Sequence, residues 1–185
     1  MRGRLRNLAA TGNAPLPVVG ALAVLLCLGP VAMALTNRAA PSPAATAPSL
    51  TDVVRSAGCE LSEFEADPRS NPPVSGRVDE RVTAKDGSYV GRRAPSALAS
   101  VHALLHGRVV VQYRPDLPPA QINRLDRYVG REPVGVLLFA NQTGMPAPVA
   151  ATAYLTLMTC PRVDAAALGA LRAFRAQRAN FGQGF

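Results

Sequence analysis

The sequence predicts an α/β or α+β domain, a small mixed sheet with flanking helices, preceded by an N-terminal hydrophobic helix. From residue 96 onward, segments of helix-forming residues alternate with short apolar runs, which predicts alternating helices and strands. Gly, Pro and capping residues mark the changes between them. The uncharged apolar run at 18–35 predicts the separate helix. With 48% hydrophobic and 17% charged residues, the composition is that of a folding chain.

The apolar run at 18–35 is a targeting segment. Its 18 residues are close to the minimum for spanning a bilayer, and three arginines precede it: Arg2, Arg4 and Arg6. Positive charge stays in the cytoplasm, so we expect residues 1–17 inside the cell and the C-terminal part outside. The sequence therefore predicts a single-pass protein of the cell membrane, with the lipid bilayer as partner of residues 18–35.

Two interpretations of this segment stay open. We favour an uncleaved transmembrane anchor. The alternative is a signal peptide cleaved after Ala34, because Ala32-Met33-Ala34 fits a small-x-small cleavage site, and the protein would then be secreted. In either case residues 36–49, rich in Ala, Pro and Ser, form a linker, and residues 50–182 form the extracytoplasmic domain.

The first part of the domain has weak structural signals. A short helix is expected within residues 51–65, followed by a loop at 67–75, where three prolines exclude both a helix and a central strand. Asp86-Gly87 signals a turn before a short apolar stretch at Tyr89-Val90.

The second part alternates clearly. Ser96 and Asp164 are N-cap residues, and Gly107 ends the first of the helices. The predicted helices are 97–106, 118–128 and 165–178, and the predicted strands are 108–113, 134–140 and 149–158. If a further strand lies within 78–90, the order of elements is thioredoxin-like, although the chain contains no CxxC redox motif.

The net charge of +8 does not indicate nucleic-acid binding. Of 20 basic residues, all but Lys85 are arginines, and three precede the targeting segment, which leaves 17 basic against 12 acidic residues in the remainder. There is no tryptophan and no basic stripe interleaved with aromatic residues. We expect no nucleic-acid partner.

His102 and His106 are the only histidines, and their spacing places both on one face of a helix. Two imidazoles at this spacing can bind zinc or copper, but a site needs a third ligand, which Cys59, Cys160 or Glu60 would have to supply. The favoured interpretation is structural: His106 caps the helix C-terminus and His102 packs at a polar edge. Neither histidine has the sequence context of a catalytic residue, and we assign no catalytic residue and no cofactor.

Cys59 and Cys160 are the cysteines of the exported part, since Cys27 lies in the apolar run. Two cysteines in an oxidising compartment predict a disulfide between them. The alternative is a pair of buried thiols.

Several segments, in this order, resemble one family. They are Asn71-Pro72-Pro73 with Ser75-Gly76, Gly87 with Tyr89, the run Val101-His102-Ala103-Leu104-Leu105-His106-Gly107-Arg108-Val109, Tyr113, Pro148-Val149-Ala150 and Ala153. The series resembles the domain of unknown function 3105 family over residues 58–182. The resemblance implies an actinobacterial, membrane-anchored or exported envelope protein, and it implies no activity.

The chain departs from the family pattern at polar positions. The family's histidine after NPP-x-x-G-x is Val78 here, its cysteine before G-x-Y is Asp86, and its glutamate between the two histidines is Leu105. The later A-W-G reads Ala153-Tyr154-Leu155. A divergent member that lacks these side chains is expected to be a non-catalytic binding or interaction module, with an envelope protein or small ligand as partner. The alternative is a metal-handling or redox-related envelope protein that uses His102 and His106.

Overall fold

The computed structural model describes residues 47–65 and 69–180. The predicted hydrophobic helix at 18–35 lies outside these residues. The described chain forms four helices and six strands: α1 (Leu50–Ser56), β1 (Glu60–Glu63), β2 (Gly87–Ser88), α2 (Ala97–Leu105), β3 (Val109–Tyr113), α3 (Pro119–Arg131), β4 (Val136–Ala140), β5 (Val149–Ala153), β6 (Thr156–Cys160) and α4 (Ala165–Arg178). None of these helices is long and apolar enough to cross a membrane.

The strands form one mixed sheet in the order β1-β6-β5-β3-β4-β2. Strands β3, β4 and β2 are parallel to one another, with Val110 opposite Leu137. The other half is antiparallel: β5 pairs with β3 and β6, and β6 pairs with β1. The fold is therefore a mixed α+β fold, one of the two classes that the sequence predicts.

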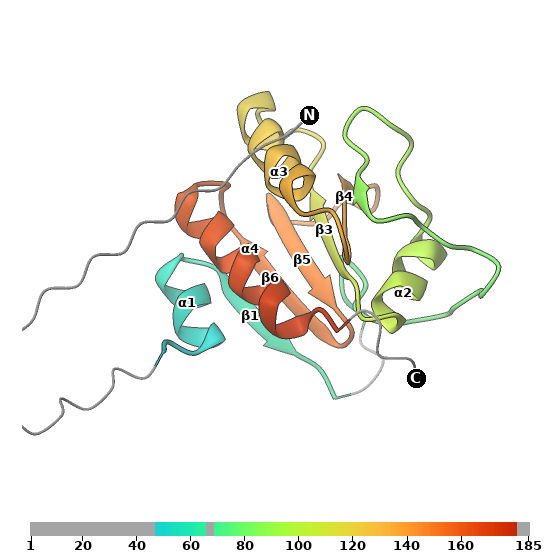
Figure 1. Ribbon diagram of the computed structural model, residues 1–185, viewed down its shortest axis with the longest axis horizontal. Helices are drawn as coiled ribbons and strands as arrows, with labels where there is room; N and C mark the ends of the chain where they lie inside the picture. The colour runs from blue at the N-terminus through green and yellow to red at the C-terminus, as the bar shows by residue number, and fades with distance from the viewer. Residues whose placement is uncertain (1–46, 66–68, 181–185) are drawn as a thin grey trace, which may run out of the picture. The chain divides into compact units, whose positions relative to one another are not determined.

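Alternating residues of the central strands separate two cores. Val109 and Val111 of β3 face the larger core, which α1, α3 and α4 cover, whereas Val110 faces the smaller core under α2. The same alternation in β4 sends Leu138 to the larger core and Leu137 to the smaller one. The helices α3 and α4 therefore share one face of the sheet, and α2 lies on the opposite face (Figure 1).

Local capping explains where the helices begin. The Oγ of Ser96 accepts a hydrogen bond from the amide of Ala99 at 3.2 Å, and Oδ1 of Asp164 accepts one from the amide of Ala167 at 2.9 Å. Ser49 and Asp52 form a capping box at the start of α1. Helix α3 begins without a side-chain cap, after Pro118 and with Pro119 as its first residue.

The short helix expected within 51–65 is present as α1, and the strand β1 at Glu60–Glu63, which was not predicted, follows it. The strand expected at 149–158 is a hairpin, β5 and β6, with its turn at Tyr154-Leu155. Leu155 takes a positive φ of 56°, which a non-glycine residue rarely adopts, so no turn-forming residue marked this hairpin in the sequence.

Gly107 joins the two faces of the sheet. It follows α2 with φ +68°, and its carbonyl accepts a hydrogen bond from the amide of Asn180, just beyond α4, at 3.0 Å. A Cβ at this position would lie 2.7 Å from the carbonyl carbon of Asn180. The site therefore requires glycine both for its backbone angle and for this close approach.

Candidate functional site

The two histidines bind each other. Their Nε2 atoms lie 2.8 Å apart, and their ring centroids are separated by 4.7 Å. His102 is buried, with 8% of its surface exposed, whereas His106, the C-cap of α2, is exposed. The Nδ1 atom of His102 is 2.9 Å from the carbonyl oxygen of Val82, in the loop before β2. A carbonyl only accepts, so this Nδ1 carries a hydrogen and donates it, and the two Nε2 atoms share one hydrogen between them.

The structure places no third metal ligand beside this pair. Within residues 47–65 and 69–180, no group of three or more His, Cys, Asp or Glu side chains is arranged to hold a metal ion. Asp79 is the carboxylate whose charge interacts with His102, but both of its oxygens bind Arg81. The hydrogen bonds from Arg81 lower the pKa of Asp79.

Cys59 and Cys160 form the predicted disulfide, with sulfurs 2.03 Å and Cα atoms 4.3 Å apart. Cys59 directly precedes β1 and Cys160 ends β6, so the bond links the outermost strand to its neighbour. Both residues are buried in the larger core. The cysteines therefore lie in the core that faces away from α2, the helix that carries the two histidines.

Polar residues in the motif segments connect loops. Asp86 accepts hydrogen bonds from Nε of Arg108 at 2.6 Å and from the amide of Gly135 at 2.8 Å, which ties the start of β2 to the segments before β3 and β4. Asn71, which precedes a cis peptide bond to Pro72, donates to the carbonyl of Thr143 and accepts from its hydroxyl. These contacts give the motif segments a structural role.

Asn141 matches a glycosylation sequon, but it is buried. Only 2% of its surface is exposed, and its Nδ2 atom donates to Oε1 of Gln112 at 2.7 Å. Its side-chain oxygen accepts from the amides of Thr143 and Met145. The side chain holds the turn after β4, and its amide nitrogen is not accessible for modification.

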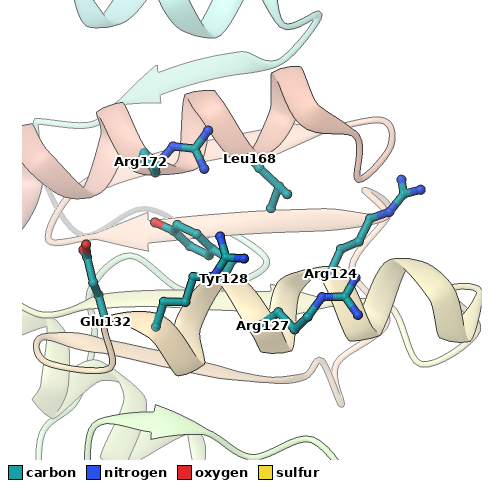
Figure 2. A pocket seen from close by; sticks show the side chains of 7 residues that line it. Arg124, Arg127, Tyr128, Glu132, Leu168 and Arg172 are labelled. Carbon is teal, nitrogen blue, oxygen red and sulfur yellow. The ribbon is translucent and has the colours of Figure 1, made fainter.

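A groove between α3 and α4 was not predicted from the sequence. The cavity has a volume of about 300 Å³, and Figure 2 shows side chains from the two helices facing each other across it. A second hollow of about 340 Å³ continues along the same helices and shares Tyr128, Glu132 and Arg172 with the first. We name the two together the arginine groove; its lining is Arg124, Arg127, Tyr128, Arg131, Glu132, Leu168, Arg172, Arg175, Ala176 and Ala179.

The arginines of this groove differ in how they are held. Arg175 binds Glu132 and the carbonyl of Val134, and Arg124 donates to the carbonyl of Val163. Arg127, Arg131 and Arg172 have no carboxylate within ion-pair distance among the described residues. The groove therefore carries an excess of positive charge.

Tyr128 contributes a neutral hydroxyl to the groove. Its burial raises the pKa, which outweighs the opposite effect of a hydrogen bond and charge from Arg175 and of the charge of Arg172. The phenol consequently keeps its proton at neutral pH and can donate it in a hydrogen bond.

The spacing of arginines in the sequence indicates one wall of this groove. Arg124, Arg127 and Arg131 recur at intervals of three and four residues, which places them along one face of α3. Leu168 and Arg172 are likewise four residues apart on α4. The sequence did not reveal that these two faces lie opposite each other.

The family model described as "Protein of unknown function (DUF3105)" matches residues 65–183. The chain belongs to this family. The span that matches DUF3105 includes both histidines, Cys160 and the arginine groove, whereas Cys59 and α1 precede it. No curated protein and no solved structure matches the chain. The DUF3105 description gives no activity, so a functional conclusion has to come from the geometry of the sites.

Proposed function

We propose that this chain is a membrane-tethered extracytoplasmic domain that acts as a non-catalytic binding module of the cell envelope, with the arginine groove as its binding site. One observation carries the proposal: the groove is a hollow in which Arg127, Arg131 and Arg172 have no carboxylate partner among the described residues, and its lining contains no Ser, Cys or His. Such a site can hold a ligand but offers neither a hydroxyl or thiol nucleophile of the usual kind nor an imidazole base.

The tether is supported by the sequence. Residues 18–35 are apolar and follow the basic N-terminus, and the Cys59–Cys160 disulfide fits an oxidising compartment outside the cytoplasm. Protease added to spheroplasts is expected to cut the chain beyond residue 37 while the N-terminus stays intact. Protection of the domain from external protease would refute the orientation. A soluble form starting at Leu35 would select the cleaved signal peptide over the anchor.

We also propose that the five strands from β2 onward have a thioredoxin-like order. The arrangement β2-β4-β3-β5-β6, parallel in its first three strands and antiparallel in the last two, supports this. Helix α2 on one face and α3 with α4 on the other support it as well. We propose no redox function from this likeness, because the chain has no CxxC motif and both cysteines of the domain are in the disulfide.

A thermal-shift screen of the full-length chain in neutral detergent, with cationic, neutral and anionic compounds, tests the binding module. We expect at least one compound to raise the melting temperature of the wild type and of the His102→Ala/His106→Ala variant, but not of Arg127→Gln/Arg172→Gln. A compound that stabilises all three chains equally binds elsewhere. If every active compound behaves so, the groove is not the binding site.

A metal-handling protein is the second candidate. One observation favours it: the Nε2 atoms of His102 and His106 converge, and Nδ1 of His102 is held by a backbone carbonyl, as in many metal-binding histidines. Against it stands the lack of a third ligand among the described residues. Metal analysis of protein purified without a His-tag decides between the candidates. One equivalent of zinc or copper, lost in the His102→Ala/His106→Ala variant, would place this candidate first.

A further inference from the structure

We infer that the arginine groove binds the phosphate group of its ligand, as a phosphate ester or as the free anion. The inference rests on the proposed binding function and names the chemistry of the ligand. Four features of the groove support it: the number of unpaired arginines, the facing geometry of the two helices, the hydroxyl of Tyr128 and the volume of the cavity.

Unpaired arginines from two helices converge on this groove. Seven arginines of the described residues form salt bridges with carboxylates, including Arg175 at the edge of the groove itself. Arg127, Arg131 and Arg172 line one cavity and have no such partner there. A single carboxylate ligand would be satisfied by one guanidinium, whereas a phosphate monoester carries about −1.5 to −2 charges and three acceptor oxygens. Several guanidinium groups around one cavity therefore fit a phosphate better.

The clustering of arginines in the groove also lowers the stability of the protein without a ligand. Arg124 and Arg127 are three residues apart, Arg127 and Arg131 four apart, and like charges at these spacings destabilise a helix. Arg172 of α4 adds a further positive charge from the opposite wall (Figure 2). A bound dianion would remove this repulsion, so occupancy should stabilise the fold.

Two further lining residues, Tyr128 and Leu168, suit an esterified phosphate. Tyr128 lies in the middle of the groove, where its phenol can donate to a phosphate oxygen, and Leu168 provides an apolar wall. A volume of about 300 Å³ exceeds what a free phosphate needs and leaves room for part of an organic group. The source of the phosphate is either a soluble compound or the headgroup of a membrane lipid, and the experiment separates the two.

The test uses the full-length chain in neutral detergent at constant ionic strength. Inorganic phosphate and glycerol 1-phosphate are the soluble probes, titrated against chloride, and melting temperature and phosphorus NMR are the readouts. In a parallel arm the chain is placed in nanodiscs of phosphatidylcholine with or without phosphatidic acid. The groove variant is Arg127→Gln/Arg172→Gln, and the charge-matched control is Arg77→Gln/Arg93→Gln, two exposed arginines that do not line the groove.

We expect phosphate or its ester to raise the melting temperature of the wild type and of the control, and the groove variant to bind at least about tenfold more weakly. Without phosphate, the groove variant should melt at the same temperature as the wild type or slightly higher, which shows that it folds. A response to phosphatidic acid but not to the soluble probes identifies a lipid headgroup, and the reverse identifies a soluble ligand.

Two results would overturn the inference. One is the absence of any phosphate response in both arms. The other is a response that the groove variant and the control lose equally, because the effect would then follow net charge rather than the groove. If the compound screen finds a ligand without phosphate that needs Arg127 and Arg172, the phosphate inference fails while the proposed binding module stands.

Discussion

The histidine pair and the arginine groove lie on opposite faces of one sheet, and their polar groups are satisfied in different ways. Beneath α2, His102 donates to the carbonyl of Val82 and shares a hydrogen with His106, so the cluster is complete within the protein. Between α3 and α4, Arg127 and Arg172 face a shared cavity without a carboxylate partner. Polar side chains that form hydrogen bonds with each other are typical of a structural role. Like charges that line a shared cavity without a partner are instead typical of a binding site for an oppositely charged ligand. This difference is why we propose that the ligand binds on the face that the motif histidines do not occupy.

The largest expected effect comes from the disulfide, which belongs to the core beneath the groove. It closes a loop with a sequence separation of 101 residues, and its loss in Cys59→Ser/Cys160→Ser should lower the free energy of unfolding by about 2–5 kcal/mol. Denaturant unfolding measures this. Hydrogen exchange should show a greater loss of protection in α1, β1 and β6 than in α2. Equal loss across the sheet would show that the two faces are not independent.

The two histidines should differ in their contribution to stability. His102 is buried and holds the loop through Val82, so His102→Ala should cost about 1–3 kcal/mol. His106 is exposed, and His106→Ala should cost less than about 1 kcal/mol. Chemical denaturation of both variants provides the measurement. A larger cost for His106→Ala would contradict a structural pair organised around His102 and would direct attention to the metal alternative.

Substitution of Gly107 tests the contact between the end of α2 and the segment that follows α4 on the other face of the sheet. Alanine at this position has to adopt a φ near +68° and meets the backbone of Asn180, so Gly107→Ala should destabilise the protein by at least about 1–2 kcal/mol. Gly91→Ala is the control, because Gly91 also has a positive φ, of 70°, but a Cβ there meets no atom within 4 Å. The difference between the two melting temperatures isolates the contact with Asn180. Equal losses would mean that backbone strain alone matters.

The smallest effect is a pH dependence in the groove. Burial raises the pKa of Tyr128, so the folded protein releases this proton at higher pH than the unfolded chain does. Stability is therefore fully present below the ordinary tyrosine pKa of about 10 and declines as the pH rises through the higher folded value. Alkaline titration by tyrosinate absorbance, with Tyr128→Phe as reference, should remove one late-titrating phenol. If Tyr128→Phe leaves the late-titrating phenols unchanged, Tyr128 does not titrate late.

Local sequence patterns predicted correctly the elements that are marked by N-cap residues, and the number of cysteines predicted the disulfide. Ser96 and Asp164 marked the starts of α2 and α4 as the structure has them, because a cap acts on amides within the next three residues. The two cysteines of the domain gave the disulfide, since only one pairing between them exists. The strand β1 was missed because Glu60, Ser62 and Glu63 are exposed and show no apolar alternation; its conformation depends on pairing with β6.

By itself, the sequence determined that the domain combines helices with a small mixed sheet, where α2 and α4 begin, and the family to which the chain belongs. The basic N-terminus and the apolar run at 18–35 also predict export. Both segments lie outside the residues that the structure describes. Only the tertiary structure decided what the polar residues do. The 2.8 Å contact between the histidines depends on side-chain rotamers and on the loop at Val82. The groove depends on the sheet, which holds α3 and α4 on one face although about 40 residues separate Arg131 from Arg172. Periodicity acts over one or two helical turns, so it places side chains on one face of a helix but does not specify which other helix that face will meet.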